Sequence, residues 1–241
     1  GVAFEVLRSE ALGLLRAAGG WGFESPANFR GTWQMLCIVC RNGSTDPQLA
    51  SEDDAGDFVW SPLAASRPTL RRFVALFGTT LRVRLSVVKA GGGMIGWHAD
   101  ANVLEAGRLI VHVPLVAPPL AMNRVGQVLF QMPEGRIHWA DYALPHTVFN
   151  ADPADRVHLL VEVLASGNTD FERNFLRGLD EEARHVLREA AIPQGPPGEW
   201  GPIGTRFARS VGRLMTQGFS KLYGPAGLDG ERAVWRELLG G

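Results

Sequence analysis

The sequence predicts a mainly β protein, an antiparallel sandwich or barrel flanked by helices. Between residues 80 and 165, short runs rich in Val, Leu and Ile are separated by Gly, Pro and Asn at short intervals. No helical periodicity lies between these runs, which favours an antiparallel sheet over alternating strands and helices. Helical patterns occur on both sides of this stretch, at 3–18 and 179–191.

The expected strands of this stretch are bounded by turn residues. We expect them at 81–89, 108–115, 127–131, 136–140, 146–150 and 156–164. The last has the clearest alternation, because successive side chains of a strand point to opposite faces. One face carries Val157, Leu159, Val161 and Val163, and the other carries Arg156, His158, Leu160 and Glu162.

The flanking segments suggest three parts. Residues 1–78, with helices at 3–18 and 68–77 and a strand at 32–41, are expected to pack on a core at 79–166. A helical C-terminal part at 167–241 contains a linker dense in Pro and Gly at 192–204.

Composition narrows the class of function. The chain has 241 residues, 46% of them hydrophobic, and a formal net charge of -1. Such a balance gives no basic field for nucleic acid, and no apolar run is long enough to cross a bilayer. The N-terminus lacks the layout of a signal peptide, so we expect a cytoplasmic protein. Cys37 and Cys40 lie on an apolar strand with no second pair, which favours buried thiols over a zinc or redox site.

A metal site is suggested by the segment GWHADAN, which contains His98 and Asp100. Two residues apart on a strand, their side chains leave the same face. His146 opens a later strand after Pro145 and offers a third ligand. Two imidazoles and one carboxylate suit a non-haem Fe(II) centre with open positions, although zinc also accepts such a set. Taken alone, the first pair also fits a turn histidine and a capping aspartate.

Arg156 is the next candidate functional residue, because it places a charge on a β-rich, mostly apolar segment. A guanidinium binds a carboxylate through two parallel hydrogen bonds. It could therefore bind the far carboxylate of 2-oxoglutarate. The alternative is an arginine at a strand start that faces water beside Asp152 or Asp155.

Four blocks of sequence together carry a family resemblance. These are H-A-D at 98–100, R-L-I-V-H-V-P-L at 108–115, E-G-R-I-H-W-A-D-Y-A-L-P-H-T-V-F-N at 134–150 and R-V-H-L-L-V-E-V at 156–163. In order and spacing they resemble the aspartyl/asparaginyl β-hydroxylase family of Fe(II)/2-oxoglutarate-dependent oxygenases, nearest to its bacterial proline hydroxylase branch. The resemblance covers about residues 80–165.

This resemblance implies a double-stranded β-helix core, a jelly roll of the cupin type. It implies His98, Asp100 and His146 as iron ligands, and Arg156 as the partner of the distal carboxylate of 2-oxoglutarate. His112 would lie near the co-substrate and Arg108 at the same mouth. Asp141 and Asn150 would position the loop that carries His146.

Two positions depart from the animal aspartyl hydroxylases. Those proteins lack the acidic ligand that Asp100 provides, and they carry a substrate-binding arginine where this chain has Ile110. We therefore predict a dioxygenase that uses O₂ to hydroxylate a neutral or cyclic amino acid, free or in a peptide or biosynthetic intermediate, and releases succinate and CO₂. The alternatives are a cupin-like metal-binding sensor without turnover and a zinc-dependent cupin hydrolase or isomerase.

Overall fold

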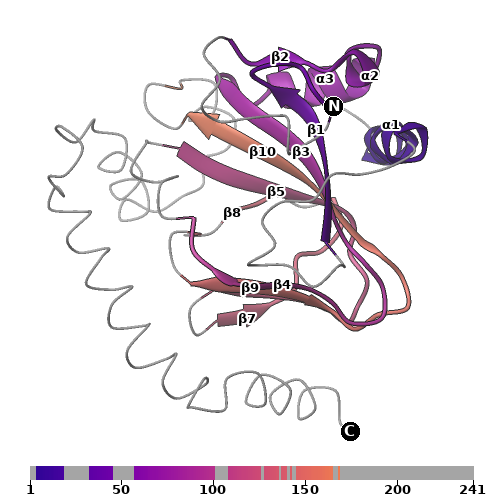
Figure 1. Ribbon diagram of the computed structural model, residues 1–241, viewed down its shortest axis with the longest axis vertical. Helices are drawn as coiled ribbons and strands as arrows, with labels where there is room; N and C mark the ends of the chain where they lie inside the picture. Colours follow the sequence, from indigo (N-terminus) through magenta and orange to yellow (C-terminus); the bar gives the residue numbers. More distant parts are fainter. Residues whose placement is uncertain are drawn as a thin grey trace, which may run out of the picture.

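Two antiparallel β-sheets face each other in the computed structural model, which confirms the double-stranded β-helix (Figure 1). The structure describes residues 4–18, 33–45, 57–100, 108–125, 128–135, 137–139, 142, 145–164 and 168. The larger sheet has the order β2 (Val59–Trp60), β1 (Trp33–Cys40), β3 (Thr80–Val88), β10 (Arg156–Leu164), β5 (Arg108–Val116) and β8 (His138–Trp139). The smaller has the order β4 (Gly93–His98), β9 (His146–Asn150), β6 (Ala121–Val125) and β7 (Val128–Phe130).

Helices cover the outer face of the larger sheet. They are α1 (Phe4–Ala17), α2 (Pro62–Ala65) and α3 (Pro68–Ala75) (Figure 1). The apolar face of β10 packs against them, in one core with Leu7, Leu14, Leu70 and Val74. The Glu10 carboxylate accepts hydrogen bonds from the free backbone N–H groups of Thr69 and Leu70, which ties α1 to the start of α3.

A second core fills the space between the sheets. Met35, Val88, Ile110 and Leu160 come from the larger sheet, and Ile95, Val125 and Val148 from the smaller one. Both faces of β10 are therefore buried. The expected alternation is confirmed, and the face with Arg156, His158 and Glu162 points into the interior.

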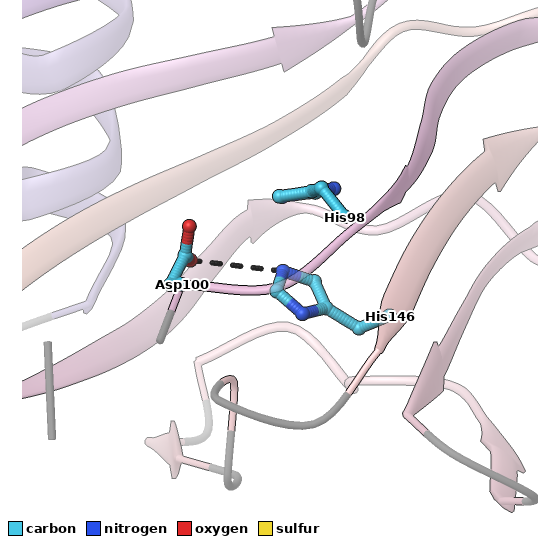
Figure 2. Close-up of side chains that lie close together, drawn as sticks. All are labelled: His98, Asp100 and His146. Atoms are coloured by element: carbon cyan, nitrogen blue, oxygen red, sulfur yellow. Dashed lines mark ion pairs between the residues drawn. The ribbon is translucent and has the colours of Figure 1, made fainter. Parts of the chain in front are cut away.

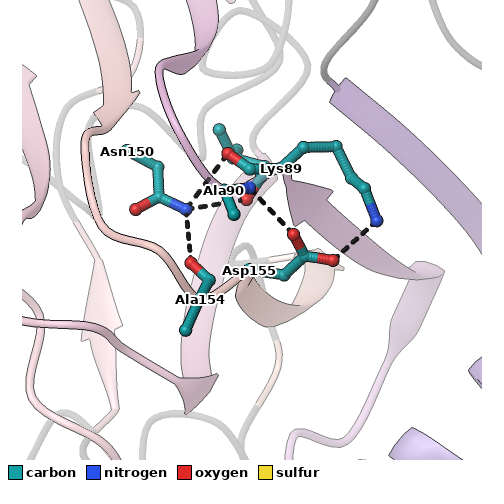
Figure 3. Close-up of polar contacts among 6 residues, drawn as sticks. Lys89, Ala90, Asn150, Ala154 and Asp155 are labelled. Atoms are coloured by element: carbon teal, nitrogen blue, oxygen red, sulfur yellow. Dashed lines mark hydrogen bonds and ion pairs between the residues drawn. The ribbon is translucent and has the colours of Figure 1, made fainter.

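One corner joins the strands that carry the site residues (Figure 3). Nδ2 of Asn150, at the end of β9, donates to the carbonyls of Val88, Lys89 and Ala154 at 3.0, 3.2 and 2.9 Å. Asp155 accepts from the Ala90 N–H and pairs with Lys89. The turn at 89–92 and the turn at 151–155 are thereby held together.

Several expectations concern other parts of the chain. Cys37 and Cys40 are both buried, as expected. The strand β6 and the short elements β2 and α2 were not expected from the sequence. Of the C-terminal part, the structure describes only Asn168, so the linker and the helix at 179–191 lie outside the described residues and the three-part division stays a prediction. Among the helices described, none combines the length and apolar character needed to cross a membrane.

Candidate metal centre

Three expected ligands lie together at the ends of β4 and β9 (Figure 2). His98 and His146 are direct partners in the register of these strands, and their ring centroids are 4.0 Å apart. Asp100 follows two residues after His98, with Oδ2 3.7 Å from Nε2 of His146. One ligand atom from each residue lies within 4.8 Å of the other two, which is compact enough for a single ion.

The surrounding backbone orients this cluster. Nδ1 of His98 is 2.8 Å from the Gly96 carbonyl oxygen, which can only accept. Nδ1 therefore carries the proton, and Nε2 presents its lone pair. The Asp100 N–H donates to the Tyr142 carbonyl at 2.9 Å, and the Thr147 hydroxyl donates to the Ile95 carbonyl at 2.7 Å.

The electrostatics of Asp100 suit a cation. Burial raises the pKa of its carboxyl, while electrostatic interactions with His98 and Arg84 act against that rise. A bound metal ion would favour the carboxylate in the same way. Two imidazoles and one carboxylate on one side of an ion fit Fe(II) with open positions, and they also fit zinc.

Arg156 is buried, with 1% of its surface exposed. Its Nη2 donates to Oδ1 of Asn123 at 2.7 Å and to Nδ1 of His158 at 3.0 Å. Burial lowers its pKa to about 10, so the guanidinium is charged at neutral pH. Among the described residues no carboxylate forms an ion pair with it. The alternative of an arginine facing water beside Asp152 or Asp155 is therefore wrong.

A line of rings runs from Arg156 to the cluster. Nδ1 of His158 is 3.4 Å from Nδ1 of His112, and the ring of His112 stacks on Tyr142 at 4.7 Å. Tyr142 in turn packs edge-on against His146 at 4.9 Å. The structure thus brings Arg156, His112 and the three expected ligands into one interior.

Arg108 lies at the edge of this interior with 29% of its side chain exposed. Its Nη1 donates to Oε1 of Glu162 at 3.1 Å, and Arg82 donates to Oε2 of the same residue at 3.1 Å. The charge of Arg108 is therefore already paired.

The sequence alone did not single out two residues of the site. Asn123 lies on β6, a short strand without a clear apolar pattern. Tyr142 is a loop residue inside the block at 134–150 that carries the family resemblance, but a lone tyrosine indicates neither metal binding nor a periodic pattern. Asp141 lies outside the described residues.

Known proteins resemble this chain at the level of family and fold. A 2OG-Fe(II) oxygenase family oxidoreductase from Burkholderia pseudomallei is 18% identical over 62% of this chain and 77% of that one, with a TM-score of 0.39. A cupin domain from Bordetella pertussis is 22% identical over 36% and 83%, with a TM-score of 0.29. A predicted oxalate decarboxylase from Thermotoga maritima is 13% identical over 61% and 95%, with a TM-score of 0.33.

A comparison with curated proteins gives no match. The family described as Aspartyl/Asparaginyl beta-hydroxylase matches residues 3–166. This match includes every strand of both sheets, the three clustered ligands and Arg156. Because it spans well over half of the 241 residues, the chain belongs to the aspartyl/asparaginyl β-hydroxylase family.

Proposed function

We propose that the protein is an Fe(II)/2-oxoglutarate-dependent dioxygenase that hydroxylates an amino acid, either free or within a larger molecule, and releases succinate and CO₂. The observation that carries this proposal is the position of Arg156. A buried guanidinium, which forms no ion pair with a described residue, shares one interior with a cluster of two histidines and one aspartate. Membership of the family supports it.

The metal would be held by Nε2 of His98, a carboxylate oxygen of Asp100 and Nε2 of His146. Ligands on one side leave positions for a chelating co-substrate and O₂. When bound, Fe(II) would couple the reduction of O₂ to the oxidative decarboxylation of 2-oxoglutarate. Asp100 takes the position that a halide would need, which favours hydroxylation over halogenation.

The co-substrate would gain its specificity from Arg156. A buried charge without a counter-ion is costly, and a carboxylate that binds it through two hydrogen bonds removes much of that cost. Asn123 and His158 accept from Nη2 and hold the guanidinium in place. His112 lies between this end and the metal ligands, where it would contact the bound co-substrate.

The decisive experiment separates this function from its two rivals. Anaerobic Fe(II) and 2-oxoglutarate should together give the visible charge-transfer absorption of a chelated 2-oxo acid. Succinate release is then measured with free, carrier-tethered and peptidyl amino acids. A zinc hydrolase or a sensor without turnover would show tight metal binding with neither the absorption nor succinate, and that result would contradict the proposal.

His146→Ala is the matched variant for this experiment. It removes one of two imidazole ligands, so Fe(II) binding should weaken sharply and turnover should be lost. Thr147→Val, at the neighbouring position, removes the hydrogen bond to Ile95 but no ligand. It should keep metal binding. Near-full activity of His146→Ala would show that the metal assignment is wrong.

A further inference from the structure

The hydroxyl of Tyr142 has no hydrogen-bond partner among the described residues, although only 7% of this residue is exposed. A buried hydroxyl without a partner costs free energy, so native structures rarely keep one. The ring alone would pack equally well as phenylalanine. The retained oxygen therefore needs an explanation in terms of something that binds there.

The surroundings of Tyr142 indicate what would bind. Its ring packs against His112 and against the expected ligand His146, at centroid distances of 4.7 and 4.9 Å. Its backbone carbonyl accepts from the N–H of Asp100 at 2.9 Å, which fixes the residue to the cluster. The hydroxyl is therefore held in the interior that contains Arg156 and the three ligands.

The charge distribution favours an anion at this hydroxyl. Burial raises the pKa of Tyr142, so the phenol is a neutral donor at physiological pH. Of the neighbouring charges, Arg156 affects the pKa of Tyr142 more strongly than Asp100 does. Arg156 has only neutral acceptors within the described part of the chain. One carboxylate could satisfy both the unpaired guanidinium and the unpaired hydroxyl.

We propose that Tyr142 is a second binding residue for the dicarboxylic co-substrate, with its hydroxyl donating a hydrogen bond to the carboxylate that Arg156 holds. This inference rests on the proposed function. It assigns the hydroxyl to the distal end of the 2-oxo diacid and not to the end that would chelate the metal.

Tyr142→Phe tests this, because it deletes the hydroxyl and keeps the ring. Anaerobic calorimetric titrations of the Fe(II)-loaded protein compare 2-oxoglutarate with 2-oxopentanoate, which lacks the distal carboxylate. Loss of a hydrogen bond to a charged group is expected to lower the affinity by roughly tenfold or more, at about 1.4 kcal/mol per tenfold. The variant should bind 2-oxoglutarate more weakly than the wild type by this factor. It should bind 2-oxopentanoate as tightly as the wild type does.

Stability supplies an independent measurement. Without ligand, Tyr142→Phe should unfold at the same temperature as the wild type or higher, since it removes an unpaired polar group. The stabilisation that 2-oxoglutarate gives should be smaller in the variant. Ser61→Ala is the control, because it removes another buried hydroxyl that has no partner among the residues described. This serine precedes α2 on the helical side of the larger sheet, so its loss should leave the co-substrate affinity unchanged.

The outcomes separate the two proposals. If the wild type binds 2-oxoglutarate and Tyr142→Phe binds it equally well, the role of the hydroxyl is refuted while the proposed function stands. Equal losses for both 2-oxo acids would also refute it, because the hydroxyl would then act at the metal end. If the metal-loaded wild type does not bind 2-oxoglutarate at all, the proposed function fails and this inference fails with it.

Discussion

Arg156 donates a hydrogen bond from Nη2 to Nδ1 of His158, two residues further along the same strand, at 3.0 Å. A guanidinium only donates, so Nδ1 of His158 carries a lone pair and its proton is on Nε2. Nδ1 of His112, 3.4 Å from the same atom, must then present a proton. The arginine thereby sets the tautomers of two buried histidines, both of which are neutral.

This network predicts a loss of stability in mild acid. Burial, followed by the charge of Arg156, lowers the pKa of both His112 and His158 well below the usual value of 6.5. As the pH falls, these two histidines therefore bind protons in the unfolded chain before they do so in the folded chain. The contribution of the two neutral histidines to the free energy of unfolding is complete above about pH 6.5. It is lost as the pH falls below that value, by up to about 1.4 kcal/mol per pH unit for each histidine. Urea unfolding between pH 8 and 5.5 measures this.

His158→Gln is the control for that experiment. Its side-chain oxygen can still accept from Arg156, but it does not titrate. The free energy of unfolding should then fall less steeply below pH 6.5 than in the wild type. Coincident slopes would show that His158 does not contribute to the pH dependence.

Arg156→Gln should separate binding from stability. The loss of a bidentate charged contact costs a few kcal/mol, so the KM for 2-oxoglutarate should rise by roughly two orders of magnitude. The ligand-free protein should be as stable as the wild type or more so, because the change removes a buried charge that has no ion-pair partner in the described part of the chain.

Arg156→Lys completes the comparison. Lysine keeps the charge but not the planar pair of donors. The affinity of this variant for 2-oxoglutarate should therefore lie between those of the wild type and Arg156→Gln. An unchanged KM in Arg156→Gln would argue against the co-substrate role and direct attention to Arg108.

Asn150 is predicted to stabilise the corner that joins β3, β9 and β10. Its side-chain amide donates to three carbonyl groups and its oxygen accepts from Asp152 N–H. Asn150→Ala should lower the free energy of unfolding by about 2–3 kcal/mol. Asn150→Asp should lower the free energy of unfolding further, because a carboxylate oxygen would then face three carbonyl oxygens. Urea unfolding checks both, and a smaller loss for Asn150→Asp than for Asn150→Ala would contradict this account.

The strands that carry the site could be predicted because their signals are local. Alternating residues identify β10, and a Gly or Pro break precedes β4 and β9. The ligand spacing then follows from strand geometry, since residues two apart share a face. The meeting of His98 with His146 in one register needed the family resemblance, because nothing local to either strand specifies it.

The missed residues depend on contacts distant in sequence. Asn123 becomes important only because β6 packs opposite β10 across the interior and brings Oδ1 to Arg156. The pairing of Arg108 with Glu162 was hidden for the same reason, since β5 and β10 become neighbours only in the folded sheet. Sequence patterns show which face a residue occupies, but not what lies opposite that face.

The nature of the substrate is the last prediction, and Ile110 provides its main argument. This side chain is 7% exposed and lies opposite Glu162 in the register of β5 and β10. Both oxygens of Glu162 already accept from arginines, Arg82 and Arg108. An acidic side chain that reached Ile110 would therefore meet an apolar surface backed by a buried carboxylate.

A carboxylate desolvated without a partner is costly, so we expect a neutral or cyclic amino acid in preference to an aspartyl side chain. Mass spectrometry should find a gain of one oxygen on such substrates, free, tethered or peptidyl. Ile110→Arg is the informative variant: it places a cation where the animal aspartyl hydroxylases have one, and it should shift the ratio of kcat/KM values towards acidic substrates. Ile110→Leu, which keeps an apolar side chain of the same size, should leave that ratio unchanged. Selective hydroxylation of aspartyl peptides by the unmodified protein, with no turnover of neutral amino acids, would overturn this prediction.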